Sequence, residues 1–80
     1  MDTEKCTVLL TAIDQGSLSG AAEVLGYTPS GVSRLVASLE ADLGLPLLTR
    51  SKGGVTPTPE CEALRPRFAE LATLGRACRE

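Results

Sequence analysis

Two helix signals separated by a very short turn constrain this chain more than any other feature. The segment Ser17-Leu18-Ser19 offers a serine hydroxyl that can cap a short helix over residues 20–25, and Gly26 ends it, because glycine readily takes the left-handed conformation after a helix. Thr28-Pro29 follows almost at once and favours a new helix, since Thr accepts from free amide groups and Pro is preset for the first helical position. The sequence therefore predicts a helix of barely two turns joined by a tight turn to a longer one.

The longer helix has an apolar face and a polar face. Gly44 supplies its end, and its apolar residues recur at helical spacing: Val32, Leu35, Val36, Leu39 and Leu43. The opposite face has small or polar side chains and one cation: Ser30, Ser33, Arg34 and Ala37. We expect this second face to point outward.

The flanking segments predict a helix before this pair and a hairpin and a helix after it. The first helix, capped by Asp2 or Thr3 and ended by Gly16, has apolar residues at i, i+3, i+4 and i+7: Cys6, Leu9, Leu10 and Ile13. Residues 46–57 are typical of a short two-stranded hairpin with a glycine-rich turn. Thr58-Pro59 then opens a final helix, in which Pro66 removes one backbone hydrogen bond.

The final helix carries an apolar seam with alternating spacings of three and four residues: Cys61, Leu64, Phe68, Leu71, Gly75 and Cys78. Such a seam is apolar either because it folds back on its own domain or because it meets a partner chain. We favour the partner, because so small a domain has little surface left to cover the seam.

Composition is that of an ordinary globular protein and offers no enzyme chemistry. The chain of 80 residues is 42% hydrophobic and 22% charged, has no His, and has three widely spaced cysteines, Cys6, Cys61 and Cys78. We therefore expect no metal site, no nucleophile with a base, and reduced, apolar thiols. No apolar run reaches the roughly 18 residues of a membrane span, and the N-terminus lacks the basic segment of a signal peptide, so we expect a cytoplasmic protein with no membrane partner.

The charge is unevenly distributed, although its net value of −2 at first argues against nucleic acid. Residues 1–27 have one Lys against four Asp or Glu, which gives −3. Residues 28–56 have Arg34, Arg50 and Lys52 against Glu40 and Asp42, which gives +1. Any phosphate contacts should therefore be concentrated in the middle of the chain.

Several motifs in fixed order carry a resemblance to a known family. Ala22, Leu25, Gly26, Val32 and Leu35 occupy the small, core and turn positions of a helix-turn-helix. The wider pattern resembles the LysR-type transcriptional regulators over roughly residues 3–75: Gly16 to Ala22, Ser30 to Arg34, Leu39-Glu40, Asp42 to Gly44, Leu47 to Arg50 and Thr58-Pro59.

The resemblance implies a mainly α fold, a winged helix-turn-helix with a three-helix core and a short β-hairpin wing, followed by a long dimerisation or linker helix. The helix-turn-helix would occupy residues 18–37 and the wing about 46–57, within a DNA-binding domain of residues 1–57, with the linker helix at 58–80. Members of the family continue into an effector domain that binds a small co-inducer. We expect this chain to be a fragment without that domain and without a cofactor.

The function that the resemblance implies is sequence-specific binding of double-stranded DNA, with the recognition helix in the major groove and the wing on the backbone or minor groove. It also implies a homodimer through the last helix, and a higher oligomer of the full-length protein is compatible with it. The alternative is a winged-helix module that binds protein and not DNA, which the net charge of −2 would suit.

The resemblance also assigns roles to individual residues. The DNA-binding candidates are Thr28, Pro29, Ser30, Ser33 and Arg34 on the recognition helix, and Arg50 and Lys52 on the wing. Arg34 could instead pair with a carboxylate, and the wing cations could serve only to discourage strand aggregation. The dimer-interface candidates are Leu64, Phe68, Leu71 and Cys78.

Two departures from the family pattern bear on these roles. Pro29 stands where members commonly have Gln, which can make bidentate contacts to adenine that Pro cannot make, so base preference should differ. Pro57-Thr58-Pro59 replaces the usual end of the wing, where Leu-Thr precedes Ala-Gly, and predicts a shorter or frayed second strand.

Overall fold

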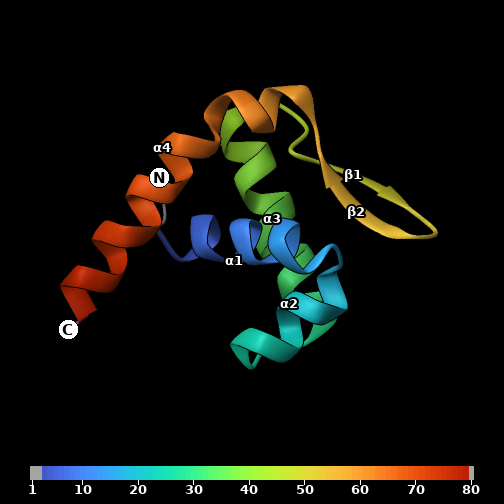
Figure 1. Cartoon of the computed structure of the whole chain (residues 1–80), viewed down its shortest axis with the longest axis horizontal. Helices are drawn as coiled ribbons and strands as arrows, with labels where there is room; N and C mark the ends of the chain where they lie inside the picture. The colour runs from blue at the N-terminus through green and yellow to red at the C-terminus, as the bar shows by residue number, and fades with distance from the viewer. Residues whose placement is uncertain (1–2, 80) are drawn as a thin grey trace.

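The computed structural model describes residues 3–79 and contains four helices and one hairpin (Figure 1). In chain order these elements are α1 (Thr3–Gln15), α2 (Leu18–Leu25), α3 (Pro29–Leu43), β1 (Leu48–Ser51), β2 (Gly54–Pro57) and α4 (Pro59–Arg79). This is the predicted winged helix-turn-helix with a long final helix. No helix in the described part of the chain has the length and apolarity needed to cross a bilayer.

Local capping chemistry forms the helix-turn-helix as predicted. The Ser17 hydroxyl accepts from the Gly20 amide at 2.9 Å, so α2 begins two residues earlier than expected. The Thr28 hydroxyl accepts from the Gly31 amide at 3.0 Å, with Pro29 at the start of α3. Gly26 and Gly44 end the two helices in the left-handed conformation.

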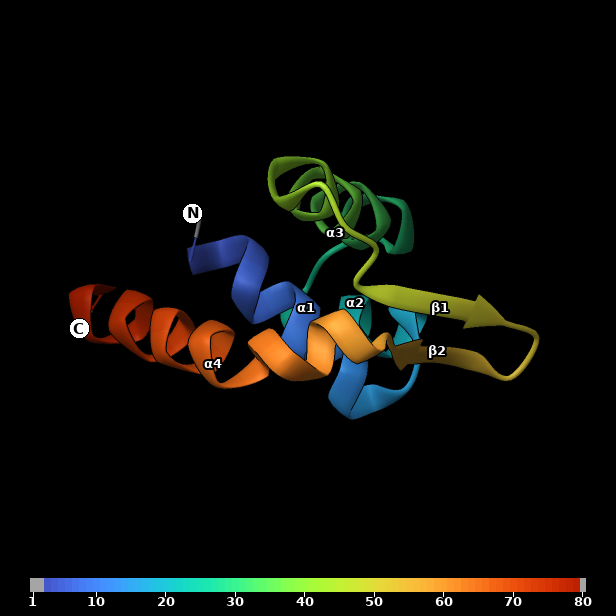
Figure 2. The same ribbon diagram turned by 90° about the horizontal axis from the view of Figure 1, so that it is seen from above.

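The core is centred on α1, which packs against α2, α3 and α4. Figure 2 shows α1 lying between α3 and α4. This placement explains why Val8 and Ala12 are fully buried while Leu10 and Ile13, two of the predicted core residues, are only half-buried. A helix covered on more than one side buries a wider face than a single apolar stripe indicates.

The seam of α4 faces its own domain, so the prediction that Phe68 lies at a dimer interface is wrong. Its side chain is 0% exposed within a single chain and belongs to the same core as Cys61 and α1. Leu64 and Leu71 are half-buried against that core, and the side chain of Cys78 lies outside the described residues. The expectation failed because α1 has a second apolar side left uncovered by α2 and α3, and α4 covers it.

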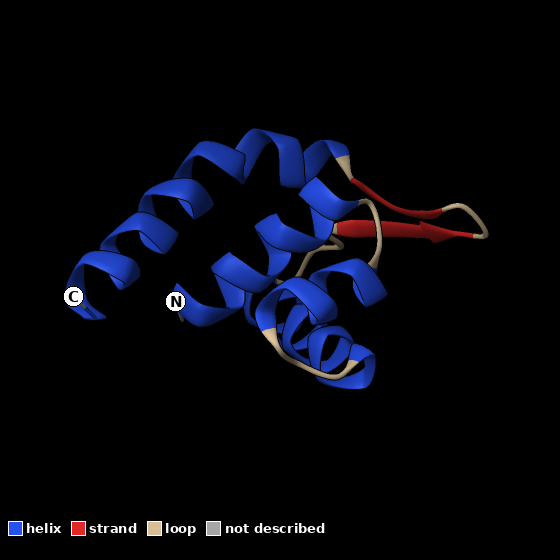
Figure 3. Cartoon of the chain, turned by 60° about the horizontal axis from the view of Figure 1, so that its bottom comes forward, coloured by secondary structure: helices blue, strands red, loops and turns tan. Residues whose placement is uncertain are grey.

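The hairpin forms along the full length of both strands, contrary to the expected shortening. Leu48 pairs with Pro57 at its base and Ser51 with Gly54 next to the turn, in antiparallel register. Figure 3 shows the two strands and their turn projecting beyond the helices. Leu48 and Val55 are buried, so each strand of the wing contributes a side chain to the core, while the turn at residues 52–53 is exposed.

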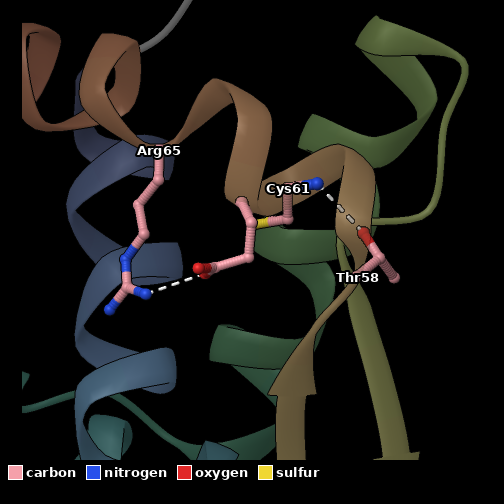
Figure 4. A network of polar contacts seen from close by, with 4 residues as sticks. Thr58, Cys61 and Arg65 are labelled. Atoms are coloured by element: carbon pink, nitrogen blue, oxygen red, sulfur yellow. Dashed lines mark hydrogen bonds and ion pairs between the residues drawn. The ribbon is translucent and has the colours of Figure 1, made fainter.

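Two polar side chains hold the base of the wing. Glu40 of α3 accepts from the backbone amides of Leu47 and Leu48 at 2.7 and 3.3 Å. Thr58 is buried; its hydroxyl donates to the Pro46 carbonyl at 2.7 Å and accepts from the Cys61 amide at 3.1 Å, capping α4 (Figure 4). The loops before and after the hairpin are thereby fixed to α3 and α4.

Cys61 behaves as an apolar core residue. Burial raises the pKa of its thiol, and the nearby carboxylates of Glu62 and Glu40 add to this, while Arg65 acts in the opposite direction. Cys6 and Cys61 are both buried, and neither forms a disulfide within the described part of the chain. Among the described residues, no group of His, Cys, Asp or Glu could hold a metal ion.

Candidate nucleic-acid interface

The start of α3 presents three of the predicted site residues to solvent. Thr28, Pro29 and Ser30 are exposed, and the hydroxyls of Thr28 and Ser30 lie 3.4 Å apart. Because Thr28 already caps Gly31, its hydroxyl has a fixed position at the end of the helix where free amide donors lie. A small polar surface with donor groups therefore surrounds the first turn of α3.

The outward face of α3 continues from this first turn. Ser30, Arg34, Ala37 and Ala41 are all exposed and recur at i, i+4, i+7 and i+11, opposite the buried stripe of Val32, Val36 and Leu39. Ser33 is half-buried beside this face. Apart from Arg34, the face has only small side chains, so another molecule can approach the helix backbone closely.

The wing carries the other two predicted cations. Arg50 lies on β1 opposite Val55, and Lys52 lies in the turn; both are exposed. Together with Ser17, Leu18 and Ser19 they line a shallow hollow of about 250 Å³, whose other walls are Ser51, Gly54 and Val55. The start of α2 and the wing are therefore brought to one place.

The cations of this surface have no acidic partner among the residues that the structure describes. Within the described part of the chain, the ion pairs join Lys5 to Asp42 at 3.1 Å and Arg65 to Glu62 at 2.7 Å, and neither involves Arg34, Arg50 or Lys52. The alternative interpretation, in which Arg34 pairs with a nearby carboxylate, is therefore not supported. Lys5 pairs with Asp42 away from the wing, so α3 and the hairpin keep three cations outside these ion pairs, while Arg67 on α4 is a further exposed cation outside them.

Sequence analysis missed the contribution of the α2 start to this surface. Ser17 and Ser19 were noted only as capping chemistry, yet they share the hollow with Arg50 and Lys52. Their proximity depends on a contact between residues that are far apart in the sequence, which no local pattern reports. The structure thus arranges the predicted DNA-binding residues as one group on α3 and another on the wing, and adds the start of α2 to the second.

Known proteins are similar to this chain in both sequence and fold. Residues 3–62 match the family described as bacterial regulatory helix-turn-helix protein, lysR family. The chain is similar to the nitrogen assimilation regulatory protein nac of Escherichia coli K12, with 43% identity over 80 residues, which cover 100% of this chain and 25% of nac. The HTH-type transcriptional regulator AceR of Acinetobacter baumannii is 38% identical over 71 residues, or 89% of this chain and 24% of AceR.

A solved structure agrees with these relatives. The DNA-binding domain of CbnR in a DNA complex matches with a TM-score of 0.88 at 28% identity, over 99% of this chain and 92% of that one. The chain spans about a quarter of the length of the curated relatives named above. The order of its helices, its wing and its sequence together show that the chain belongs to the LysR family of bacterial regulatory helix-turn-helix proteins.

Proposed function

We propose that this chain is the sequence-specific DNA-binding part of a transcriptional regulator that acts on double-stranded DNA in the bacterial cytoplasm. The observation that carries the proposal is the exposed face of α3, where small residues surround an Arg34 that has no acidic partner in the described chain. A helix with such a face can enter the major groove, where an Arg fork recognises a guanine edge. The solved structure of the CbnR DNA-binding domain, which shares the fold, is of a complex with DNA.

The second group of residues suits the phosphate backbone. Arg50 and Lys52 are free cations, and Ser17 and Ser19 are hydroxyl donors at the start of a helix. Phosphate contacts of this kind fix the orientation of a protein on the duplex and carry no sequence information by themselves. In this division of roles, α3 selects the sequence, and the wing with the α2 start positions the domain.

Pro29 narrows what the first turn of α3 can recognise. Its ring has no hydrogen-bond donor or acceptor, so it can make only apolar contacts, for example with a thymine methyl group. Ser30, which follows it, has an exposed hydroxyl that can donate or accept. We therefore expect the chain to discriminate less between bases at the base pair that Pro29 faces than it would with Gln at that position.

Gel mobility shift with a duplex at low and moderate salt tests DNA binding directly. Binding that weakens as salt rises supports the proposal, because counterion release dominates such complexes. Arg34→Lys is the matched variant of Arg34→Ala, since it keeps the charge and loses the fork. Absence of any shift at low salt would contradict the proposal and favour the protein-binding alternative.

Two copies of the chain associate through α4 in this proposal, but by its outer face and not by Phe68. Pro66, Ala69, Glu70 and Thr73 line an open groove of about 670 Å³ on that face. Small side chains let a second helix approach closely, and a two-fold dimer would present two α3 helices to two half-sites. Ala69 is exposed, so Ala69→Arg should leave the fold intact and convert dimers to monomers in sedimentation equilibrium. A wild-type monomer at all concentrations would contradict this part of the proposal.

A further inference from the structure

One of the contacts that join the wing to the helix-turn-helix is a hydrogen bond between two backbone groups. The amide of Val55, in β2, donates to the carbonyl of Gly16 at 2.9 Å. Gly16 lies between α1 and α2, directly before the Ser17 that caps α2. The hairpin therefore docks on the turn that introduces the helix-turn-helix.

Gly54 makes this approach possible, and no other residue type fits there. Its φ is 128°, which L side chains rarely adopt, and a Cβ built on it would lie 2.0 Å from the Gly16 carbonyl oxygen and 3.3 Å from the carbonyl carbon. Both atoms belong to the backbone, so neither can move aside as a flexible side chain could. The neighbouring Gly53 differs: a Cβ there would meet nothing within 4 Å.

Because of the strand register, the docking of β2 on Gly16 also fixes the position of Arg50, a cation of the proposed interface. Val55 pairs with Arg50, and Gly54 pairs with Ser51. Val55 is also 7% exposed, so its side chain anchors the same residue whose amide contacts Gly16. Two consecutive links, from Gly16 to Val55 and from Val55 to Arg50, set where Arg50 lies relative to α2.

We infer that Gly54 is a positioning residue of the DNA interface, because its bare backbone lets the wing dock on the α1–α2 turn and so fixes the wing cations relative to the recognition helix. This inference rests on the DNA binding proposed above. A docked wing is already ordered before DNA arrives, so binding does not bear the entropic cost of ordering it. Gly54 touches no DNA in this account; it acts through Arg50 and Lys52.

The matched pair Gly54→Ala and Gly53→Ala tests the inference in DNA binding. Gly54→Ala should lower duplex affinity. The logarithm of the association constant should also fall less steeply with log salt, by about two units of slope, since two phosphate contacts are lost with the wing cations. Gly53→Ala should change neither quantity. Adding Gly54→Ala to the Arg50→Ala, Lys52→Ala variant should cause no further loss, and preference for a cognate over a scrambled site should persist, because α3 is untouched.

A second measurement on the wild-type chain does not depend on DNA or on how Gly54→Ala folds. NMR should detect scalar coupling through the hydrogen bond between the Val55 nitrogen and the Gly16 carbonyl carbon, and slow hydrogen exchange at the Val55 amide. Absent coupling with fast exchange, or a salt slope for folded Gly54→Ala equal to that of Gly53→Ala, would overturn the inference. If the wild-type chain bound no duplex, the proposed function would fail, and the NMR result alone would decide whether the junction exists.

Discussion

The helices α3 and α4 begin with the same Thr-Pro pair, but their first turns have different roles. Thr28 and Thr58 each accept from the amide three residues ahead, at 3.0 and 3.1 Å. Thr28 is exposed, with the Ser30 hydroxyl as its neighbour, whereas Thr58 is 7% exposed and also donates to the Pro46 carbonyl. The same sequence signal therefore begins α3, whose N-terminus is exposed at the proposed interface, and α4, whose N-terminus is buried in the core.

The difference shows that a cap specifies where a helix begins, while the surroundings decide what its first turn does. At α3 the free amide donors remain available to an anion. At α4 the same kind of turn is covered by the loop before β1, so its polar groups are satisfied internally and contribute to stability. Changes in α4 should therefore affect stability, and changes on the exposed face of α3 should affect mainly DNA binding.

The largest effect is expected at the centre of the α4 contact. Phe68→Ala should lower the free energy of unfolding by about 3–5 kcal/mol, because it removes a fully buried aromatic ring from the contact with α1. Denaturant unfolding followed by helical circular dichroism measures this. Val24→Ala is the control, since Val24 is 59% exposed and its loss should cost less than about 0.5 kcal/mol. If Phe68→Ala lowered the free energy of unfolding as little as Val24→Ala does, α4 would not be part of the core.

Removal of the buried cap should have the next largest effect. Thr58→Ala should lower the free energy of unfolding by about 2–4 kcal/mol, because it removes a helix cap and leaves the Pro46 carbonyl without its donor. Thr58→Ser keeps the hydroxyl and should recover most of this stability. The DNA affinity of folded Thr58→Ala should stay close to that of the wild type, because Glu40 and the hydrogen bond from Val55 to Gly16 still hold the wing. If the variant lost as much free energy of DNA binding as of unfolding, α4 and the DNA interface would not be independent.

Replacement of Arg34 should affect DNA affinity and leave stability almost unchanged. Arg34→Ala should weaken binding to a cognate site by about 1–3 kcal/mol, with much less change on a scrambled site, if the side chain contacts a base edge. Its stability should stay within about 0.5 kcal/mol of the wild type, because Arg34 is exposed and has no partner in the described chain. Titration of both sites decides this, and equal losses on the two would make Arg34 a phosphate contact.

The smallest effect should come from the exposed cap. Thr28→Ala should cost about 1 kcal/mol of stability, since the bonds lost, to the Gly31 amide and to the Ser30 hydroxyl, are exposed and water can replace them. Thr28→Ser preserves the cap and serves as control in the same denaturant titration. A loss for Thr28→Ala as large as that for Thr58→Ala would contradict the distinction between the open and the buried helix end.

Capping residues explain how much of the fold could be predicted from the sequence. Ser17, Gly26, Thr28 and Gly44 act on groups within a few residues of themselves, so their pattern predicts where helices begin and end. The same is true of the exposed positions on α3, because the apolar stripe fixes which side is left to solvent. These local rules were enough to place Ser30 and Arg34 on the outward face.

Contacts between distant segments explain what could not be predicted. Spacing identified the apolar seam of α4, but spacing alone does not say whether α1 or a partner chain covers Phe68. The approach of Gly54 to Gly16 depends on the docking of the hairpin and has no local sequence signal beyond the glycines themselves. Glu40 likewise appeared as part of a family pattern, and only the structure shows it accepting from the amides of Leu47 and Leu48.

The central claim is that DNA contacts α3 and the wing while α4 stays away from the duplex. Titration of the isotope-labelled chain with a duplex, followed by amide chemical shifts, tests this most directly. The account predicts the largest shift changes at residues 17–19, 28–34 and 50–55, and small ones along residues 59–73 of α4. Changes concentrated on α4, or no changes at a salt concentration where mobility shift detects binding, would contradict it.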